Sequence, residues 1–155
     1  MKLSHVGIVV DVNGGIAAGI KLFESFGYSV KLHVRRSEPW IGEMVGIPEA
    51  DIEVVHLGKD GESVGIELLA YHYPTQRQGL QHLAYVVDDL DAEASKVCEY
   101  QPLKAPDVWS IPWSIPQMTR RGKAEIPDGP NSGTVCGYLE GRNNIIIELI
   151  QKPKQ

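Results

Sequence analysis

Cysteine is scarce in this chain, which has only Cys98 and Cys136 among its 155 residues. Two thiols are too few for a disulfide framework, and their spacing is not that of a Cys-x-x-Cys motif. The hydrophobic residues make up 43% of the sequence, which is enough to bury the core of one folded domain. We therefore expect a single domain over residues 1–155 in which both cysteines are ordinary half-buried thiols.

Long apolar runs and a basic surface are also missing. No run approaches the roughly 18 residues that a membrane span needs, and the first residues lack the charged and apolar regions of a signal peptide. The net charge is −5 and the isoelectric point is near 5.5, with short basic stretches only at residues 35–36 and 120–123. Because nucleic-acid-binding domains usually have a basic face, we expect a cytoplasmic protein without nucleic-acid or membrane partners.

Two common catalytic signatures are absent as well. The sequence contains no Gly-x-Ser-x-Gly elbow and no glycine-rich phosphate-binding loop. These absences argue against a serine hydrolase and against a nucleotide-binding enzyme.

What the sequence does contain is an internal repeat. Residues 3–11 read LSHVGIVVD and residues 80–88 read LQHLAYVVD, so that His5 and His82 correspond at a spacing of 77 positions (82 − 5). A period of half the chain is too long for a solenoid and indicates a duplicated module. We expect module one to span residues 1–75 and module two residues 76–155.

The two modules also end alike. Residues 64–69 read VGIELL and residues 145–150 read IIIELI, each with one glutamate inside an apolar run. The spacing from histidine to glutamate is 62 residues (67 − 5) in the first module and 66 (148 − 82) in the second. A single loop insertion would account for the difference, so that Glu67 and Glu148 occupy corresponding places.

Hydrophobic periodicity predicts the order βαβββ in each module. Apolar residues recur at helical spacing between two glycine-containing turns in module one, and Asp60-Gly61 between two β-rich runs indicates a hairpin. The segment 101–133 is rich in proline and tryptophan, and we expect one short strand near 104–108 followed by a loop. The other expected elements are strands at 2–10, 28–34, 51–57, 63–71, 82–87, 134–139 and 144–151, helices at 16–26 and 90–100, and an irregular segment at 35–50 that could form a short helix around 41–45.

The alternation of side chains along a strand predicts where the repeated residues point. His5 lies opposite the face formed by Val6, Ile8 and Val10, and Glu67 and Glu148 likewise lie opposite the residues that would pack on the helices. If the eight strands curl into a cup, two imidazoles and two carboxylates converge inside an apolar cavity. Buried carboxylates are costly unless they are paired, and a divalent cation would pair with both.

At this point the sequence resembles the vicinal oxygen chelate superfamily, which includes glyoxalase I, methylmalonyl-CoA epimerase, extradiol dioxygenases and bleomycin-resistance proteins. The resemblance is carried by residues 80–85, 87–90 and 128–133. It implies an α+β fold in which two βαβββ modules form an eight-stranded, cup-shaped half-barrel with helices outside. It also implies that His5, Glu67, His82 and Glu148 are ligands of one divalent ion per site, namely Ni, Co, Fe, Mn or Zn.

The activity that the resemblance implies depends on the fourth ligand. Extradiol dioxygenases leave the position of Glu67 without a ligand, whereas glyoxalase I and methylmalonyl-CoA epimerase fill it. We therefore expect an isomerase or lyase that moves a proton next to the carbonyl of a carbonyl or thioester substrate, with the metal as a Lewis acid that favours an enediolate and with Glu67 and Glu148 also as catalytic bases. A ring-cleaving dioxygenase and a non-catalytic binding protein are the alternatives.

The remaining candidates have weaker signals. Trp40, Trp109 and Trp113 lie in irregular segments, where they could cover the substrate. His33, His56 and His72 have no counterpart in the repeat, and we expect surface or structural roles for them. We also expect a homodimer, because the cup leaves sheet edges and an apolar rim to be covered.

Overall fold

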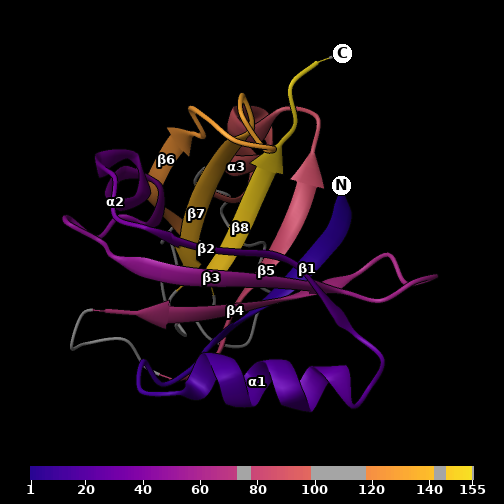
Figure 1. Ribbon diagram of the computed structural model, residues 1–155. Coiled ribbons are helices and arrows are strands. Elements are labelled where there is room, and N and C mark those ends of the chain that lie inside the picture. Colours follow the sequence, from indigo (N-terminus) through magenta and orange to yellow (C-terminus); the bar gives the residue numbers. More distant parts are fainter. Residues whose placement is uncertain (73–77, 99–117, 142–145, 155) are drawn as a thin grey trace, which may run out of the picture.

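The fold is known from a computed structural model, which describes residues 1–72, 78–98, 118–141 and 146–154. Within these residues, eight strands form one mixed sheet that is not closed, and three helices pack on it (Figure 1). The predicted α+β half-barrel is thus confirmed. The boundary between modules, at residues 75 and 76, lies outside the described residues. The elements are β1 (Lys2–Val9), α1 (Gly15–Glu24), β2 (Ser29–Arg36), α2 (Pro39–Val45), β3 (Ile52–Gly58), β4 (Gly65–Tyr71), β5 (Gly79–Val87), α3 (Leu90–Cys98), β6 (Met118–Glu125), β7 (Val135–Gly141) and β8 (Ile146–Gln151).

The strand order shows the duplication directly. It runs β2-β3-β4-β1-β5-β8-β7-β6, so that the second half of the sheet repeats the first in reverse order. The repeated first strands, β1 and β5, are antiparallel neighbours at the centre, and each pairs in parallel with the last strand of its own module. This arrangement places the two corresponding strand pairs of the repeat, β1–β4 and β5–β8, side by side.

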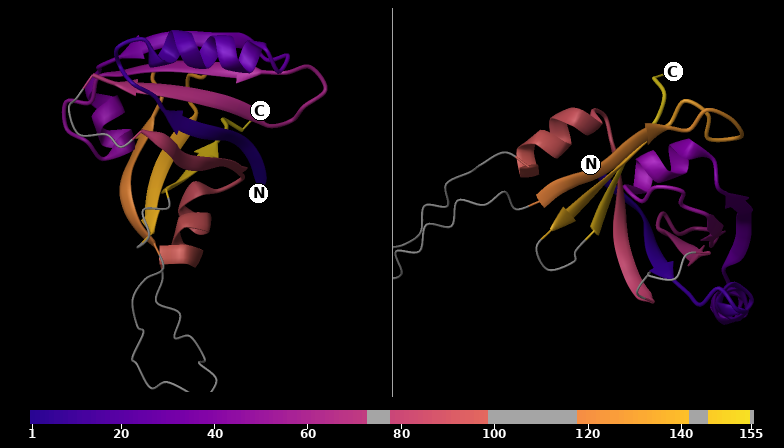
Figure 2. Two further views of the ribbon diagram at one scale, coloured as in Figure 1. Left: turned by 90° about the horizontal axis from the view of Figure 1, so that it is seen from below. Right: turned by 90° about the vertical axis from the view of Figure 1, so that its left-hand side faces the viewer.

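Helices α1 and α3 cover the outer face of the sheet (Figure 2). Ile16, Ile20 and Phe23 of α1 pack with Val55 and Leu68 of module one. In module two, Leu90 and Ala94 of α3 pack with Leu139 and Leu149. The strand residues in these contacts alternate with those of the inner face, as the period of two predicts.

Helix α2 lies on the inner face instead. Its buried Ile41 and Val45 belong to the same cluster as Val9, Leu69 and Ile146. Pro39 occupies the first turn and Gly46, with a φ of 68°, ends the helix. The irregular segment of module one thus forms a short helix, and this helix packs against β6 and β7 of module two inside the cup.

Strand β6 corrects one prediction. We expected a loop after residue 108, but residues 118–125 form an eight-residue strand at the edge of the sheet. The proline content of 101–133 argued against a strand here, but Pro116 and Pro127 flank residues 118–125 and do not interrupt them. An edge strand also needs hydrogen bonds on only one side. The expected strand at 104–108 lies outside the described residues.

No helix in the described part of the chain is long and apolar enough to cross a membrane.

Candidate functional site

The two histidines of the repeat point into the cup, and a β-bulge precedes each of them. Ser4 is the extra residue of β1 between the pairs Leu3–Tyr85 and His5–Ala84, and Gln81 is the extra residue of β5 opposite Gly7 and Ile8. A bulge turns the strand locally and re-aims the side chain of the extra residue. Strict alternation, as we assumed from the sequence, places Ser4 on the far face, whereas it lines the same cavity as His5.

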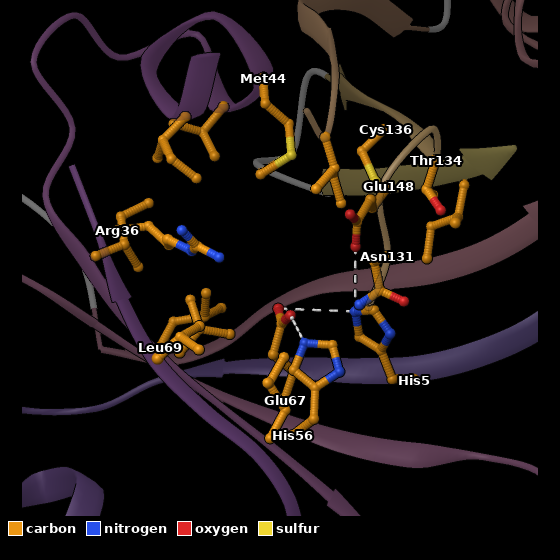
Figure 3. A pocket seen from close by; sticks show the side chains of 18 of the residues that line it. His5, Arg36, Met44, His56, Glu67, Leu69, Asn131, Thr134, Cys136 and Glu148 are labelled. Atoms are coloured by element: carbon orange, nitrogen blue, oxygen red, sulfur yellow. Dashed lines mark ion pairs between the residues drawn. The ribbon is translucent and has the colours of Figure 1, made fainter. Parts of the chain in front are cut away.

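The four predicted ligand residues converge at the bottom of the cup, and all four are buried. The Nε2 atoms of His5 and His82 are 3.2 Å apart. Oε2 of Glu148 is 3.1 Å from Nε2 of His5 and 3.4 Å from Nε2 of His82. Oε2 of Glu67 is 3.7 Å and 3.3 Å from the same two nitrogen atoms. Figure 3 shows His5, Glu67 and Glu148 meeting in this way.

The arrangement fits a divalent ion. An ion bonded at about 2.0–2.2 Å by tetrahedral ligands requires ligand–ligand separations of roughly 3.3–3.6 Å. The five separations that involve a histidine nitrogen are 3.1–3.7 Å and bracket this range, and all four ligand atoms lie within 4.8 Å of one another. Oε2 of Glu67 and Oε2 of Glu148 are also buried without a hydrogen-bond partner among the described residues. Such carboxylate oxygens are costly unless a cation binds them.

His56 contacts this cluster, which the surface or structural role expected from the sequence did not specify. It lies opposite Glu67 in the β3–β4 ladder, and its Nε2 is 2.6 Å from Oε1 of Glu67. Residues paired across antiparallel strands share a face. The register of the hairpin around Asp60-Gly61 was the signal that could have identified His56, whereas the repeat could not, because the corresponding residue of module two is Tyr138.

Tyr138 pairs with Glu148 in the β7–β8 ladder, as His56 pairs with Glu67. Its ring packs edge-on against His82, with 5.4 Å between ring centroids, and the ring of His56 lies at the same separation from His5. Burial raises the pKa of the Tyr138 hydroxyl well above its usual value, and the nearby carboxylates raise it further. Tyr138 therefore stays neutral and acts as a packing partner of His82.

The charges of the cluster depend on one another. Burial raises the pKa of the Glu67 carboxyl, but the approach of His56 and His82 outweighs burial and holds that pKa well below its usual range. The same competition, with His5 and His82 nearby, lowers the pKa of Glu148 to about 2. Both carboxyl groups are therefore ionised at neutral pH, and the site favours positive charge between them.

A chain of hydrogen bonds orients the imidazole ring of His82 on the side away from the carboxylates. Its Nδ1 donates to Oε1 of Gln81 at 3.0 Å, and Nε2 of Gln81 donates to the Tyr71 hydroxyl, also at 3.0 Å. This chain leaves Nε2 of His82 facing the two carboxylates. Burial lowers the pKa of His82, but the contacts with Glu148 and Glu67 outweigh it and raise that pKa to about 10. Such supporting hydrogen bonds are typical of metal-binding histidines.

A cavity of about 230 Å³ opens above the cluster. Glu67, Glu148, His5 and His56 form its floor, β2 and β3 form one wall, and α2 forms the roof, from which Met44 points inwards (Figure 3). Arg36 and Asn131 also line the cavity.

The other predicted residues divide into three groups. Trp40 lines the cavity, whereas Trp109 and Trp113 lie outside the described residues. His33 and His72 lie away from the cavity beside Glu53. Cys98 is half-buried, but Cys136 is buried and lines the cavity next to Glu148, because it belongs to the inner face of β7. The expectation of a half-buried thiol was therefore wrong for Cys136.

No protein-family model and no curated protein matches the sequence. Solved structures do match. Methylmalonyl-CoA epimerase from Mycobacterium tuberculosis is 16% identical, with a TM-score of 0.63 over 99% of this chain and 89% of that chain. A Streptomyces coelicolor methylmalonyl-CoA epimerase variant, solved with 2-nitronate-propionyl-CoA, is 15% identical, with a TM-score of 0.57 over 99% of both chains.

A variant of 4-hydroxymandelate synthase from Streptomyces coelicolor also matches, at 15% identity and a TM-score of 0.60. The match covers 99% of this chain and 49% of that one. At such low identity the likeness concerns the fold. The paired βαβββ modules of this chain thus form the fold of the vicinal oxygen chelate proteins, to which the sequence already showed a resemblance.

Proposed function

We propose that the protein is a metal-dependent isomerase or lyase that moves a proton next to the carbonyl of a small carbonyl or thioester substrate. The observation that carries the proposal is the position of Glu67, whose Oε2 points to the same place as the ligand atoms of His5, His82 and Glu148. Three such residues would suffice to hold an ion that must also bind oxygen. A fourth favours chemistry in which the ion binds only the substrate.

We propose His5, Glu67, His82 and Glu148 as ligands of one Ni, Co, Fe, Mn or Zn ion. When bound, the ion would act as a Lewis acid that polarises the substrate carbonyl. Glu67 and Glu148 come from different modules, and each carboxylate has an oxygen that faces the cluster. We propose them as the catalytic bases as well, while His56 holds Oε1 of Glu67 in place.

Metal binding is the first test. Elemental analysis and calorimetry should find about one divalent ion per chain, because the ligand set is of nitrogen and oxygen type. His82→Ala should lose most of the affinity, and His72→Ala serves as the matched control outside the cluster. If none of the five ions binds, the assignment of the site is wrong.

Proton exchange is the test of the reaction. With a panel of 2-oxoaldehyde hemithioacetals and 2-substituted acyl-CoA thioesters in D₂O, we expect NMR to detect exchange of the hydrogen next to the carbonyl. Glu67→Gln and Glu148→Gln should each slow the exchange about 10²-fold or more, which is the scale for loss of a positioned base.

A ring-cleaving or other dioxygenase is the second candidate, and the likeness to 4-hydroxymandelate synthase is the observation in its favour. Oxygen uptake with catechols and ferrous iron is the competing assay. Uptake without deuterium exchange on any panel member would favour the dioxygenase. The absence of both deuterium exchange and oxygen uptake, together with tight binding of an acyl or aromatic ligand, would favour a binding protein.

A homodimer also remains a prediction. The edge strands of the sheet are β2 and β6, and exposed edges are usually covered or protected. Light scattering that gave the 17.1 kDa of one chain at micromolar concentration would count against it.

A further inference from the structure

The cavity above the four-residue cluster has an apolar middle section. Strand β2 directs every second side chain into the cup, which places Leu32 and Val34 on one wall. Val54 of β3 extends this wall, and Trp40 and Met44 of α2 lie over it. The opposite side is also aliphatic and contains Ile126 and Ile150.

Part of this apolar surface is left uncovered by the protein itself. Leu32, Val34 and Val54 are only partly buried although they lie on the inner side of the cup. Trp40 and Met44 are likewise partly buried and pack at the edge of the core. A ligand that covers these side chains gains affinity from the burial of apolar surface, about fourfold for each methylene group removed from water.

The polar groups of the cavity are separated into two places. His5, His56, Glu67 and Glu148 lie at the floor, and Arg36 and Asp128 form a second charged group that is joined by an ion pair. Two cations line the cavity, Arg36 and Lys152. Lys152 is exposed, so that solvent screens its charge. Glu38 holds Nη1 of Arg36 at 2.9 Å, and Asp128 holds Nη2 at 3.3 Å. These two carboxylates neutralise the guanidinium, so that the middle section offers an anionic group no strong partner.

We propose that the substrate carries its metal-facing oxygen atoms on a short, uncharged apolar group, either a branched aliphatic chain or a single aromatic ring. This group packs against Leu32, Val34 and Val54 beneath α2. The cavity volume of about 230 Å³ is below the roughly 300–1,000 Å³ of pockets for drug-sized ligands, which limits the group to a compact one. The inference rests on the proposed function, because that function places the oxygen-bearing end at the cluster.

Hydroxamates test the inference, because they bind metals through two oxygen atoms while their side group can be varied. Acetohydroxamate, isovalerohydroxamate, benzohydroxamate and succinohydroxamate would be titrated calorimetrically into the Co²⁺-loaded protein. Isovalerohydroxamate has three carbon atoms more than acetohydroxamate, and at about fourfold per buried carbon we expect it to bind ~10- to 60-fold more tightly. Benzohydroxamate should show a similar gain, and succinohydroxamate, which adds a carboxylate, should show none.

Two valines of β2 provide a matched pair of variants. Val34 lines the cavity, whereas Val30 lies on the same strand, is 40% exposed and does not line it. Val34→Thr places a hydroxyl group in the wall at nearly the same volume and should reduce the ratio of isovalero- to acetohydroxamate affinity severalfold. Val30→Thr should leave the ratio as in the original chain.

The outcomes separate the two proposals. If acetohydroxamate binds the Co²⁺-loaded protein but the apolar hydroxamates gain nothing, the inference fails and the metal site stands. Tighter binding of succinohydroxamate would overturn the inference in favour of an anionic substrate. Failure of every hydroxamate to bind would overturn the proposed function and the inference together.

Discussion

The two modules present nearly the same half-site but different walls. In each module a bulge residue precedes the histidine, the glutamate lies on the last strand, and a small residue of the other module lies across from the histidine. Gly7 faces His82 in this way, and Ala84 faces His5. The duplication is therefore preserved closely where four side chains must meet at one point.

The walls differ because α2 occurs in module one alone among the described elements. It extends from between β2 and β3 across to module two, where it lies against the inner face of β6 at Gly122. The corresponding face of β2 stays open and forms the wall with Leu32 and Val34. The cavity thus lies beneath α2, between β2 and β3 of module one and β7 and β8 of module two.

The largest expected effect comes from Gly7. A Cβ atom at this position would overlap the imidazole ring of His82. Gly7→Ala should therefore move a ligand and weaken metal binding by about 100-fold or more, since even supporting residues of metal sites cost 10–100-fold. Calorimetry with Zn²⁺ measures the change. Ala84→Gly, at the corresponding position, should keep the affinity within a few-fold, and equal losses in both variants would contradict this asymmetry.

A substitution of Gly122 tests the packing of α2 against β6 of module two. A Cβ atom here would overlap the carbonyl oxygen of Glu43 in α2, so that Gly122→Val must push the helix away from β6. We expect a loss of about 1–3 kcal/mol in the free energy of unfolding, as for other overpacked cores, measured by urea denaturation. Thr119→Val on the same strand is the control, because Thr119 is exposed. A fully stable Gly122→Val protein would show that α2 does not depend on this contact.

His56 and Tyr138 occupy corresponding positions, and exchanging each for phenylalanine separates their roles. His56→Phe removes the donor to Oε1 of Glu67 and should weaken metal binding by about tenfold or more. His56→Gln retains a donor and should recover much of the loss. Tyr138→Phe removes only the hydroxyl group and should leave metal binding close to that of the original chain. Competition titrations with a chelating dye give the three affinities.

The smallest expected effect concerns the two bulge residues. Gln81 accepts from Nδ1 of His82, and Gln81→Ala should weaken metal binding by about tenfold or less. Ser4→Ala, at the corresponding bulge, should have no measurable effect, because no hydrogen bond from Ser4 to His5 is among the contacts of the described residues. If Ser4→Ala weakened metal binding as much as Gln81→Ala, the hydrogen bond from the bulge residue to the histidine would not be a special feature of module two.

The repeat in the sequence was sufficient to predict the two modules, the order of most elements and the four residues of the cluster. Two physical facts made this possible. A strand alternates its side chains with a period of two, so that the apolar residues facing a helix also fix the direction of His5 and Glu67. Duplicated modules pack in similar ways, so that matched positions are expected to meet around one centre.

The tertiary structure alone decided the features that break the repeat. His56 contacts Glu67 through the register of the β3–β4 pair, and bulges shift the alternation so that Ser4 lines the cavity and Gln81 reaches Nδ1 of His82. Strand β6 forms because β7 offers it an edge, and α2 takes its position from a backbone contact with the other module. Each of these features depends on contacts between residues far apart in the sequence, whereas periodicity reports only on neighbours along the chain.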